Sequence, residues 1–227
     1  MARIFPLFAT LAVLLLLANF VAGLWIGDFN ASAQRRVQTF NAYTQLKDRP
    51  TASTEAIETA KADLAAADAD FSSPRQRMTL HMLLGSSAAL AVVLVCSVAI
   101  TYFIGVSRWC KEVVEAYHLP VSFAEQMAVL KRRTFRWSLV SIGAVIALIA
   151  SGAAADPSAM GAFYWDTAAL VQPHFLLAMV GMAIVIGSFW MQWQIMQTNF
   201  AVLEEVMSGV RAARAARGLP TEANSAQ

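Results

Sequence analysis

The sequence predicts an all-α, polytopic integral membrane protein in which four transmembrane helices form two long helical hairpins, with helical extensions outside the bilayer. Only 14% of the 227 residues are charged and 58% are hydrophobic, whereas about 25% of the residues of an ordinary soluble domain are charged. Four stretches contain no Asp, Glu, Lys or Arg: residues 4–27, 78–107, 137–155 and 167–203. Each is long enough to cross a hydrocarbon core, which takes about 20 apolar residues.

We expect one membrane domain over residues 1–217 and a disordered tail over 218–227. The predicted spans are about 4–27, 78–106, 137–155 and 172–195. The segments expected outside the bilayer are an outer helical hairpin at 31–73, an inner helical loop at 107–136 and an inner amphipathic helix at 200–217. These extensions are too small and too scattered to form a separate catalytic domain with its own core.

The first apolar stretch has two interpretations. Ala31-Ser32-Ala33 has the small-x-small form of a signal peptidase site. A signal peptide, however, has an apolar core of about 7–15 residues, whereas this run continues to the interfacial residue Trp25. We favour an uncleaved transmembrane helix over a leader that is cleaved after Ala33.

The outer hairpin is expected to begin as a continuation of the first span through residues 31–46. Lys47-Asp48-Arg49-Pro50 interrupts that helix, and Ser53 is a suitable N-cap for an alanine-rich helix from Thr54 to about Phe71. The apolar seam between these two helices is thin. We therefore expect the hairpin to be mobile unless it packs on a partner or on another copy of the chain.

Later helix boundaries carry clearer signals. Pro120 ends the helix that continues the second span, and Ser122 with Glu125 has the S-x-x-E pattern of a capping box. Gly218 and Pro220 supply a stop signal after the fourth span. The inner loop and the C-terminal extension are therefore both predicted to be helical.

Basic residues predict the orientation. If both termini are cytoplasmic, ten Lys and Arg residues lie inside and seven lie outside, all seven of them in the first loop. We expect this topology in a bacterial inner membrane. Tryptophans support it, since Trp25 and Trp165 fall at outer ends of spans and the other four fall at inner ends. Arg211, Arg214 and Arg217 lie along one side of the last helix, where they could meet anionic headgroups.

Several kinds of chemistry are disfavoured. The two cysteines, Cys96 and Cys110, have no CxxC spacing, which excludes a disulfide framework and a thiolate metal site. Cys110 lies in the inner loop, so we expect it to react with a membrane-impermeant reagent only in opened cells. Glu115 and His118 have the E-x-x-H spacing of di-iron bundles, but such a site needs two of these motifs. The small net charge, +2, gives no basic surface for nucleic acid.

The pair His81 and His174 is the one candidate cofactor site. Both histidines fall in the outer turns of their spans, on faces of small residues that include Gly85 and Gly181, which we expect to leave room for a haem macrocycle. If Tyr102 marks the inner end of the second span, the two histidines are level; if Trp109 marks it, they are not. The alternative is that they are interfacial side chains hydrogen-bonded to backbone or headgroups.

The inner end of the fourth span is polar. Gln192, Gln194, Gln197, Thr198 and Asn199 lie among aromatic residues there. Such side chains can hydrogen-bond across helices or hold a quinone or headgroup, and an interfacial turn that leaves the bilayer is the simpler interpretation.

The leading expectation for function is a non-catalytic scaffold, accessory subunit or assembly component, because no catalytic motif and no intramembrane charge is present. Its partners would be the lipid bilayer and other membrane proteins or a second copy of the chain. The main alternative is a small b-type cytochrome with haem between His81 and His174. For the leading function we expect no cofactor; for this alternative the cofactor is haem b. A third is the input unit of a membrane sensor.

Overall fold

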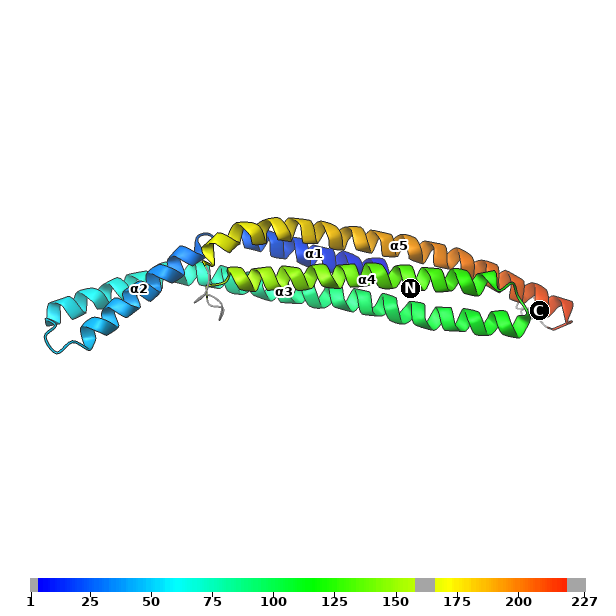
Figure 1. Cartoon of the computed structure of the whole chain (residues 1–227), viewed down its shortest axis with the longest axis horizontal. Coiled ribbons are helices and arrows are strands. Elements are labelled where there is room, and N and C mark those ends of the chain that lie inside the picture. Colours follow the sequence, from blue (N-terminus) through cyan, green and yellow to red (C-terminus); the bar gives the residue numbers. More distant parts are fainter. Residues whose placement is uncertain (1–3, 158–165, 220–227) are drawn as a thin grey trace, which may run out of the picture. The chain divides into compact units, whose positions relative to one another are not determined.

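The structure of the protein is a computed structural model that describes residues 4–157 and 166–219. Within these ranges it contains helices and no β-strand, so the predicted all-α class is confirmed. The helices are α1 (Ile4–Leu24), α2 (Phe29–Lys47), α3 (Thr54–Tyr117), α4 (Ser122–Ala155), the short 3-10 helix η2 (Ala168–Leu170) and α5 (Val171–Ala216) (Figure 1). Predictions that concern Arg3, Trp165 and residues 220–227 lie outside the described residues.

Four helical segments are long and apolar enough to cross a membrane: α1, α3, α4 and η2 with α5. The protein itself buries only 11–33% of the residues in their most apolar windows. Leu83, Leu90 and Leu139, for example, are 63%, 72% and 64% exposed. Since helices with so much exposed apolar surface are unfavourable in water, hydrocarbon is the environment that suits them.

A turn separates α1 from α2, where the sequence predicted one continuous helix. Gly27 has a φ of +79°, a left-handed conformation that glycine adopts without steric cost. The carboxylate of Asp28 accepts a hydrogen bond of 3.2 Å from the amide of Ala31 and caps α2. The prediction was wrong because this Gly-Asp pair ends one helix and begins the next.

Helix α3 continues through Pro74, although the sequence predicted that the outer helix ends near Phe71. Proline removes the hydrogen bond to the carbonyl four residues earlier, here that of Asp70, and its ring crowds the same carbonyl. Asp70 is exposed, so solvent can replace the lost donor. The helix boundaries predicted at Ser53, at Pro120 with Ser122 and at Gly218 agree with the structure.

Those confirmed boundaries have clear physical causes. The hydroxyl of Ser53 accepts a hydrogen bond of 3.2 Å from the Ala56 amide, as expected of an N-cap. Helix α4 begins at Ser122, just after Pro120. Helix α5 ends at Ala216, followed by Gly218 with a φ of +67°.

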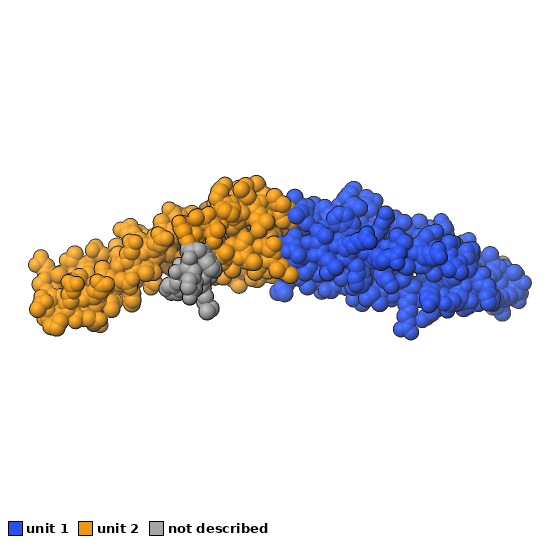
Figure 2. Space-filling view, in the orientation of Figure 1, with its two compact units in different colours: residues 1–12, 90–145, 182–227 blue, residues 13–89, 146–181 orange. Residues whose placement is uncertain are grey.

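The helices divide into two compact units, which Figure 2 shows in different colours. Unit 1 comprises residues 1–12, 90–145 and 182–227, and unit 2 comprises residues 13–89 and 146–181. Large side chains fill the core of unit 1, among them the fully buried Phe5, Phe103, Met127 and Met196. The buried apolar residues of unit 2 are mostly alanines such as Ala67 and Ala88, which allow its helices to approach closely.

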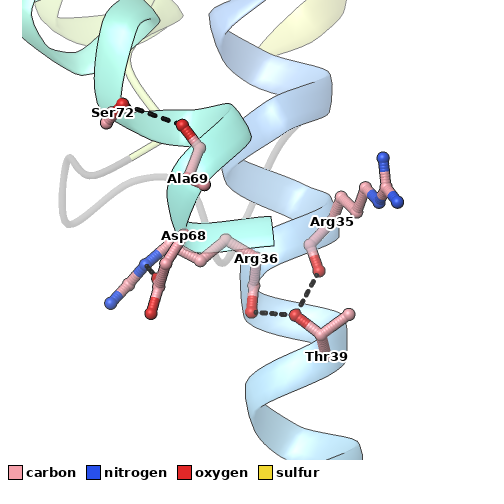
Figure 3. A network of polar contacts seen from close by, with 6 residues as sticks. All are labelled: Arg35, Arg36, Thr39, Asp68, Ala69 and Ser72. Carbon is pink, nitrogen blue, oxygen red and sulfur yellow. Dashed lines mark hydrogen bonds and ion pairs between the residues drawn. The ribbon is translucent and has the colours of Figure 1, made fainter. Parts of the chain in front are cut away.

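In unit 2, α2 lies alongside the first part of α3 (Figure 1). Ion pairs join these helices: Arg36 Nε lies 2.6 Å from Asp68 Oδ1, and Arg35 Nη1 lies 3.2 Å from Asp70 Oδ2. Figure 3 shows the first of these pairs and the hydroxyl of Thr39, which donates to carbonyls of α2. Exposed ion pairs contribute about 0–1 kcal/mol each, so this hairpin is held together weakly.

Candidate functional site

The two histidines predicted as candidate ligands lie side by side in unit 2. His81 is on α3 and His174 is near the start of α5. Their ring centroids are 6.5 Å apart, and the ring planes are inclined at 77° (both rings half-buried). The two side chains are therefore level with each other, which is the arrangement that the Tyr102 marker predicted and the Trp109 marker did not.

The orientation of the His81 ring is set by helix α1. The Nδ1 atom of His81 lies 3.0 Å from the carbonyl oxygen of Asn19. A carbonyl oxygen only accepts, so Nδ1 carries the proton and donates it. The Nε2 atom then has a lone pair, and it has no hydrogen-bond partner among the described residues.

The orientation of the His174 ring is set by helix α4. The Ser151 hydroxyl lies 2.8 Å from Nδ1 of His174 and donates its proton to the carbonyl of Leu148 at 2.9 Å. A hydroxyl has a single proton; with that proton on the Leu148 carbonyl, Ser151 accepts from Nδ1–H of His174. In this arrangement His174 has the same tautomer as His81, with its Nε2 lone pair available.

Two glycines make room for these rings. A Cβ atom on Gly23 would lie 3.0 Å from Cε1 of His81, and one on Gly152 would lie 3.2 Å from Cε1 of His174. Each glycine therefore lets a neighbouring helix support one imidazole ring. The clearance that we expected from Gly85 and Gly181 is already filled, by the Asn19 amide and by Leu148 respectively.

Among the described residues, the surroundings of the pair include aromatic rings, the half-buried Arg77 and an unsatisfied polar atom of Asn19. The rings of Phe20 and Phe175 stack at 5.6 Å between centroids. The Oδ1 atom of Asn19 is buried and has no hydrogen-bond partner. One helical turn before His81, Arg77 donates to the carbonyl of Trp25 at 3.2 Å, with its guanidinium 5.0 Å from the centroid of the Trp25 ring.

The number of protein ligands limits which metal could bind. The described residues contain no group of three or more His, Cys, Asp or Glu side chains that could hold a metal ion. Zinc sites need three or four protein ligands, whereas haem iron takes four bonds from its macrocycle and two from axial ligands. Two histidines are fewer protein ligands than a zinc site needs, whereas two is the number that a haem iron would take from the protein.

The distance between the two ring centroids can be compared with that of two histidines bound to one iron atom. A bond from such a metal to an imidazole nitrogen is about 2 Å, and the ring centroid lies roughly 1 Å farther along, so two trans histidines have centroids about 6 Å apart. The observed separation is 6.5 Å. The separation of the two ring centroids is therefore close to this value.

The predicted surface arginines are placed differently from one another. Arg211 is exposed and Arg214 is half-buried. Arg217 follows the end of α5, with its guanidinium 5.9 Å from the centroid of the Tyr117 ring. Contact of these three side chains with lipid headgroups stays a prediction.

The polar end of the fourth span contains both buried side chains that bond to other helices and exposed side chains. Gln192 and Asn199 are fully buried; Gln192 accepts a hydrogen bond of 3.3 Å from Ser138, and Asn199 donates one of 2.8 Å to the hydroxyl of Tyr102. These are hydrogen bonds between helices. The exposed members of the group are Gln194, Gln197 and Thr198.

Sequence reasoning missed the residues that support the histidines: Asn19, Gly23, Ser151 and Gly152. One signal was present, since Asn19 is the only side-chain amide between Ile4 and Gly27 and lies one turn from Gly23. Comparison with family models, with curated proteins and with solved structures finds no match to this chain. The histidine pair therefore has to be interpreted from its own geometry.

Proposed function

We propose that this chain is an integral protein of the bacterial inner membrane with four spans and both termini in the cytoplasm. Exposed apolar faces on all four long helices support insertion. Six Lys and Arg residues lie between positions 108 and 136, and none lies between positions 156 and 170. This asymmetry supports an inner location for the first of these segments.

A thiol-labelling experiment tests the topology, but the native Cys110 cannot report it as we expected. Its side chain is fully buried, and burial raises the pKa of its thiol, so both access and the thiolate fraction are low. Ala66 of the outer hairpin and Ala116 of the inner loop are exposed. Ala66→Cys should react with a membrane-impermeant reagent in cells with an intact inner membrane, and Ala116→Cys only after opening.

The native chain is the control for this experiment, because both of its cysteines are buried and should stay unlabelled. Labelling of Ala116→Cys in unopened cells, with protection of Ala66→Cys, would reverse the proposed orientation.

We propose further that His81 and His174 are the axial ligands of a haem b, and that the protein exchanges electrons within the membrane. One observation carries this proposal. Both histidines donate through Nδ1, both have an Nε2 lone pair, and the rings stand 6.5 Å apart. Hydrogen bonds to Nδ1 fix the tautomer and orientation of metal-ligating histidines.

The other groups near the pair fit the same ligand. Haem b supplies one-electron chemistry when bound and carries two anionic propionates. Arg77, one turn from His81 toward the start of α3, could hold a propionate through its guanidinium. Phe20 and Phe175 offer apolar surface to the macrocycle, and the buried Oδ1 of Asn19 lacks a partner that a ligand could supply.

Mild detergent purification from cells supplied with haem tests this function. We expect absorbance bands of a haem that change on reduction by dithionite and return on oxidation. Purified protein without such bands would rule out the cytochrome function. Identification of co-purifying proteins in the same sample tests the second candidate.

That second candidate is the scaffold role. Val37 and Phe40 on α2 are 53% and 49% exposed, and they lie on one helix face in the hairpin that we place outside the bilayer. Exposed apolar side chains in water favour a protein partner. Val37→Ser with Phe40→Ser should release a partner bound there and leave any haem bands unchanged.

A further inference from the structure

The core of unit 1 contains a seam of buried polar side chains that the histidine site does not use. Ser138 and Ser141 on α4 and Ser188 and Gln192 on α5 are all 0% exposed. The Cys96 thiol on α3, also 0% exposed, has Ser138, Ser141 and Gln192 as polar neighbours. Three helices therefore bring these polar side chains together around one place in the core.

The hydrogen bonds of this polar seam are incomplete. Ser138 donates to Oε1 of Gln192 at 3.3 Å. Three atoms of the seam have no partner that meets the geometry of a hydrogen bond: Oγ of Ser141, Oγ of Ser188 and Nε2 of Gln192. The Cys96 thiol, a weak donor and acceptor, is a neighbour of Ser141 and Gln192 and does not satisfy them. A buried polar group without a hydrogen bond costs about 1–3 kcal/mol, so three such atoms in one place are unfavourable.

We infer that the polar seam is a binding site for internal water. The unsatisfied atoms are two hydroxyls, which donate and accept, and one amide NH₂, which donates. A water molecule usually makes about three hydrogen bonds to buried polar groups, and this set provides that number. Ser188 and Gln192 are one helical turn apart on α5 and face the same side, so a single molecule can reach both.

Water is the occupant that this donor set favours. The described part of unit 1 offers no charged side chain in the seam, which argues against a metal ion or an anionic ligand. An apolar ligand would leave the three atoms without partners. This inference is independent of haem, because it uses only residues of unit 1.

Serine-to-alanine substitutions test the inference by the sign of their effect. If water binds, Ser141→Ala and Ser188→Ala each remove a water-mediated bond and lower the thermal midpoint by roughly 2–4 °C. If the site is dry, each removes an unsatisfied hydroxyl and the midpoint stays the same or rises. Ser97→Ala is the matched control, because Ser97 is exposed and donates to its own helix at Val93.

Infrared spectroscopy gives a readout that packing alone would not move. Exchange into H₂¹⁸O should shift an O–H stretching band of bound water in the native protein, and the band should be lost in the Ser141→Ala, Ser188→Ala double variant. An unchanged or raised midpoint, together with no ¹⁸O-sensitive band in the native protein, would overturn the inference.

Discussion

The two units complete their polar interactions in different ways. In unit 2, each histidine has its Nδ1 proton bound by a neighbouring helix and keeps one Nε2 lone pair. In unit 1, serine hydroxyls and a glutamine amide group are left without partners. A lone pair on imidazole is a ligand for a metal, whereas unsatisfied hydroxyl and amide groups match water. Similar faces of small residues on the same helices can therefore support different chemistry. The atoms that lack a hydrogen-bond partner indicate whether a metal or water fits.

Removal of either histidine should have the largest effect, because it tests whether unit 2 binds haem at all. His81→Ala and His174→Ala each leave one axial position without a protein ligand, so we expect loss of the haem absorbance bands while the protein still inserts. His118→Asn is the control: His118 is exposed and has a φ of +57°, which asparagine tolerates. Bands that persist in both alanine variants would place any haem elsewhere.

Substitution of Ser151 should have the second-largest effect on haem binding, because Ser151 orients His174 without itself binding the iron. Loss of a hydrogen-bonding partner behind a metal ligand typically costs 10–100-fold in metal affinity. We expect Ser151→Ala to weaken haem binding by about that factor in a titration of the apoprotein. Ser86→Ala, at an exposed position on α3 in the same unit, should bind haem as the native chain does. Equal affinities in the two variants would contradict the positioning role.

Gly152 tests the close approach of α4 to the His174 ring. A Cβ at Gly152 would press on Cε1 at 3.2 Å, while Gly143 on the same helix has nothing within 4 Å of its Cβ position. Overpacking typically costs about 1–3 kcal/mol, so Gly152→Ala should weaken haem binding by roughly tenfold. Gly143→Ala should be neutral, and a similar loss in both would indicate a general effect on the helix.

Arg77 should have the smallest effect, because partly exposed ion pairs are worth only about 0–1 kcal/mol. We expect Arg77→Gln to weaken haem binding by less than about fivefold. Loss of a positive charge beside the haem favours the oxidised form, so the midpoint potential should fall. Arg75→Gln removes the same charge from another face of α3, and a redox titration that gives the same fall for both variants would show that Arg77 makes no specific contact.

Sequence reasoning succeeded where the determinants are local. The Ser53 cap, the break at Pro120 and the stop at Gly218 each depend on residues within one turn. It failed at Gly27, where a single left-handed residue followed by a capping aspartate is enough to end a helix, and near Phe71, where the predicted helix end is absent and α3 continues through Pro74.

The histidine site was predictable only in part. Helical spacing placed His81 and His174 on faces of small residues. Whether the two histidines lie at the same depth depended on where each span ends, and the number of residues per turn does not determine that end. The support from Asn19 and Ser151 comes from other helices, 62 and 23 residues away in sequence. Contacts at such separations depend on packing, and a single sequence carries no signal for most of them.

Titration of haem into the purified apoprotein tests the central claim most directly. The paired Nε2 lone pairs of His81 and His174 predict saturation at one haem per chain, with the absorbance spectrum of six-coordinate, low-spin iron. The His81→Ala, His174→Ala double variant should show no saturable binding under the same conditions. Absence of saturable binding to the native chain, or equal binding to the double variant, would contradict the assignment of this pair as haem ligands.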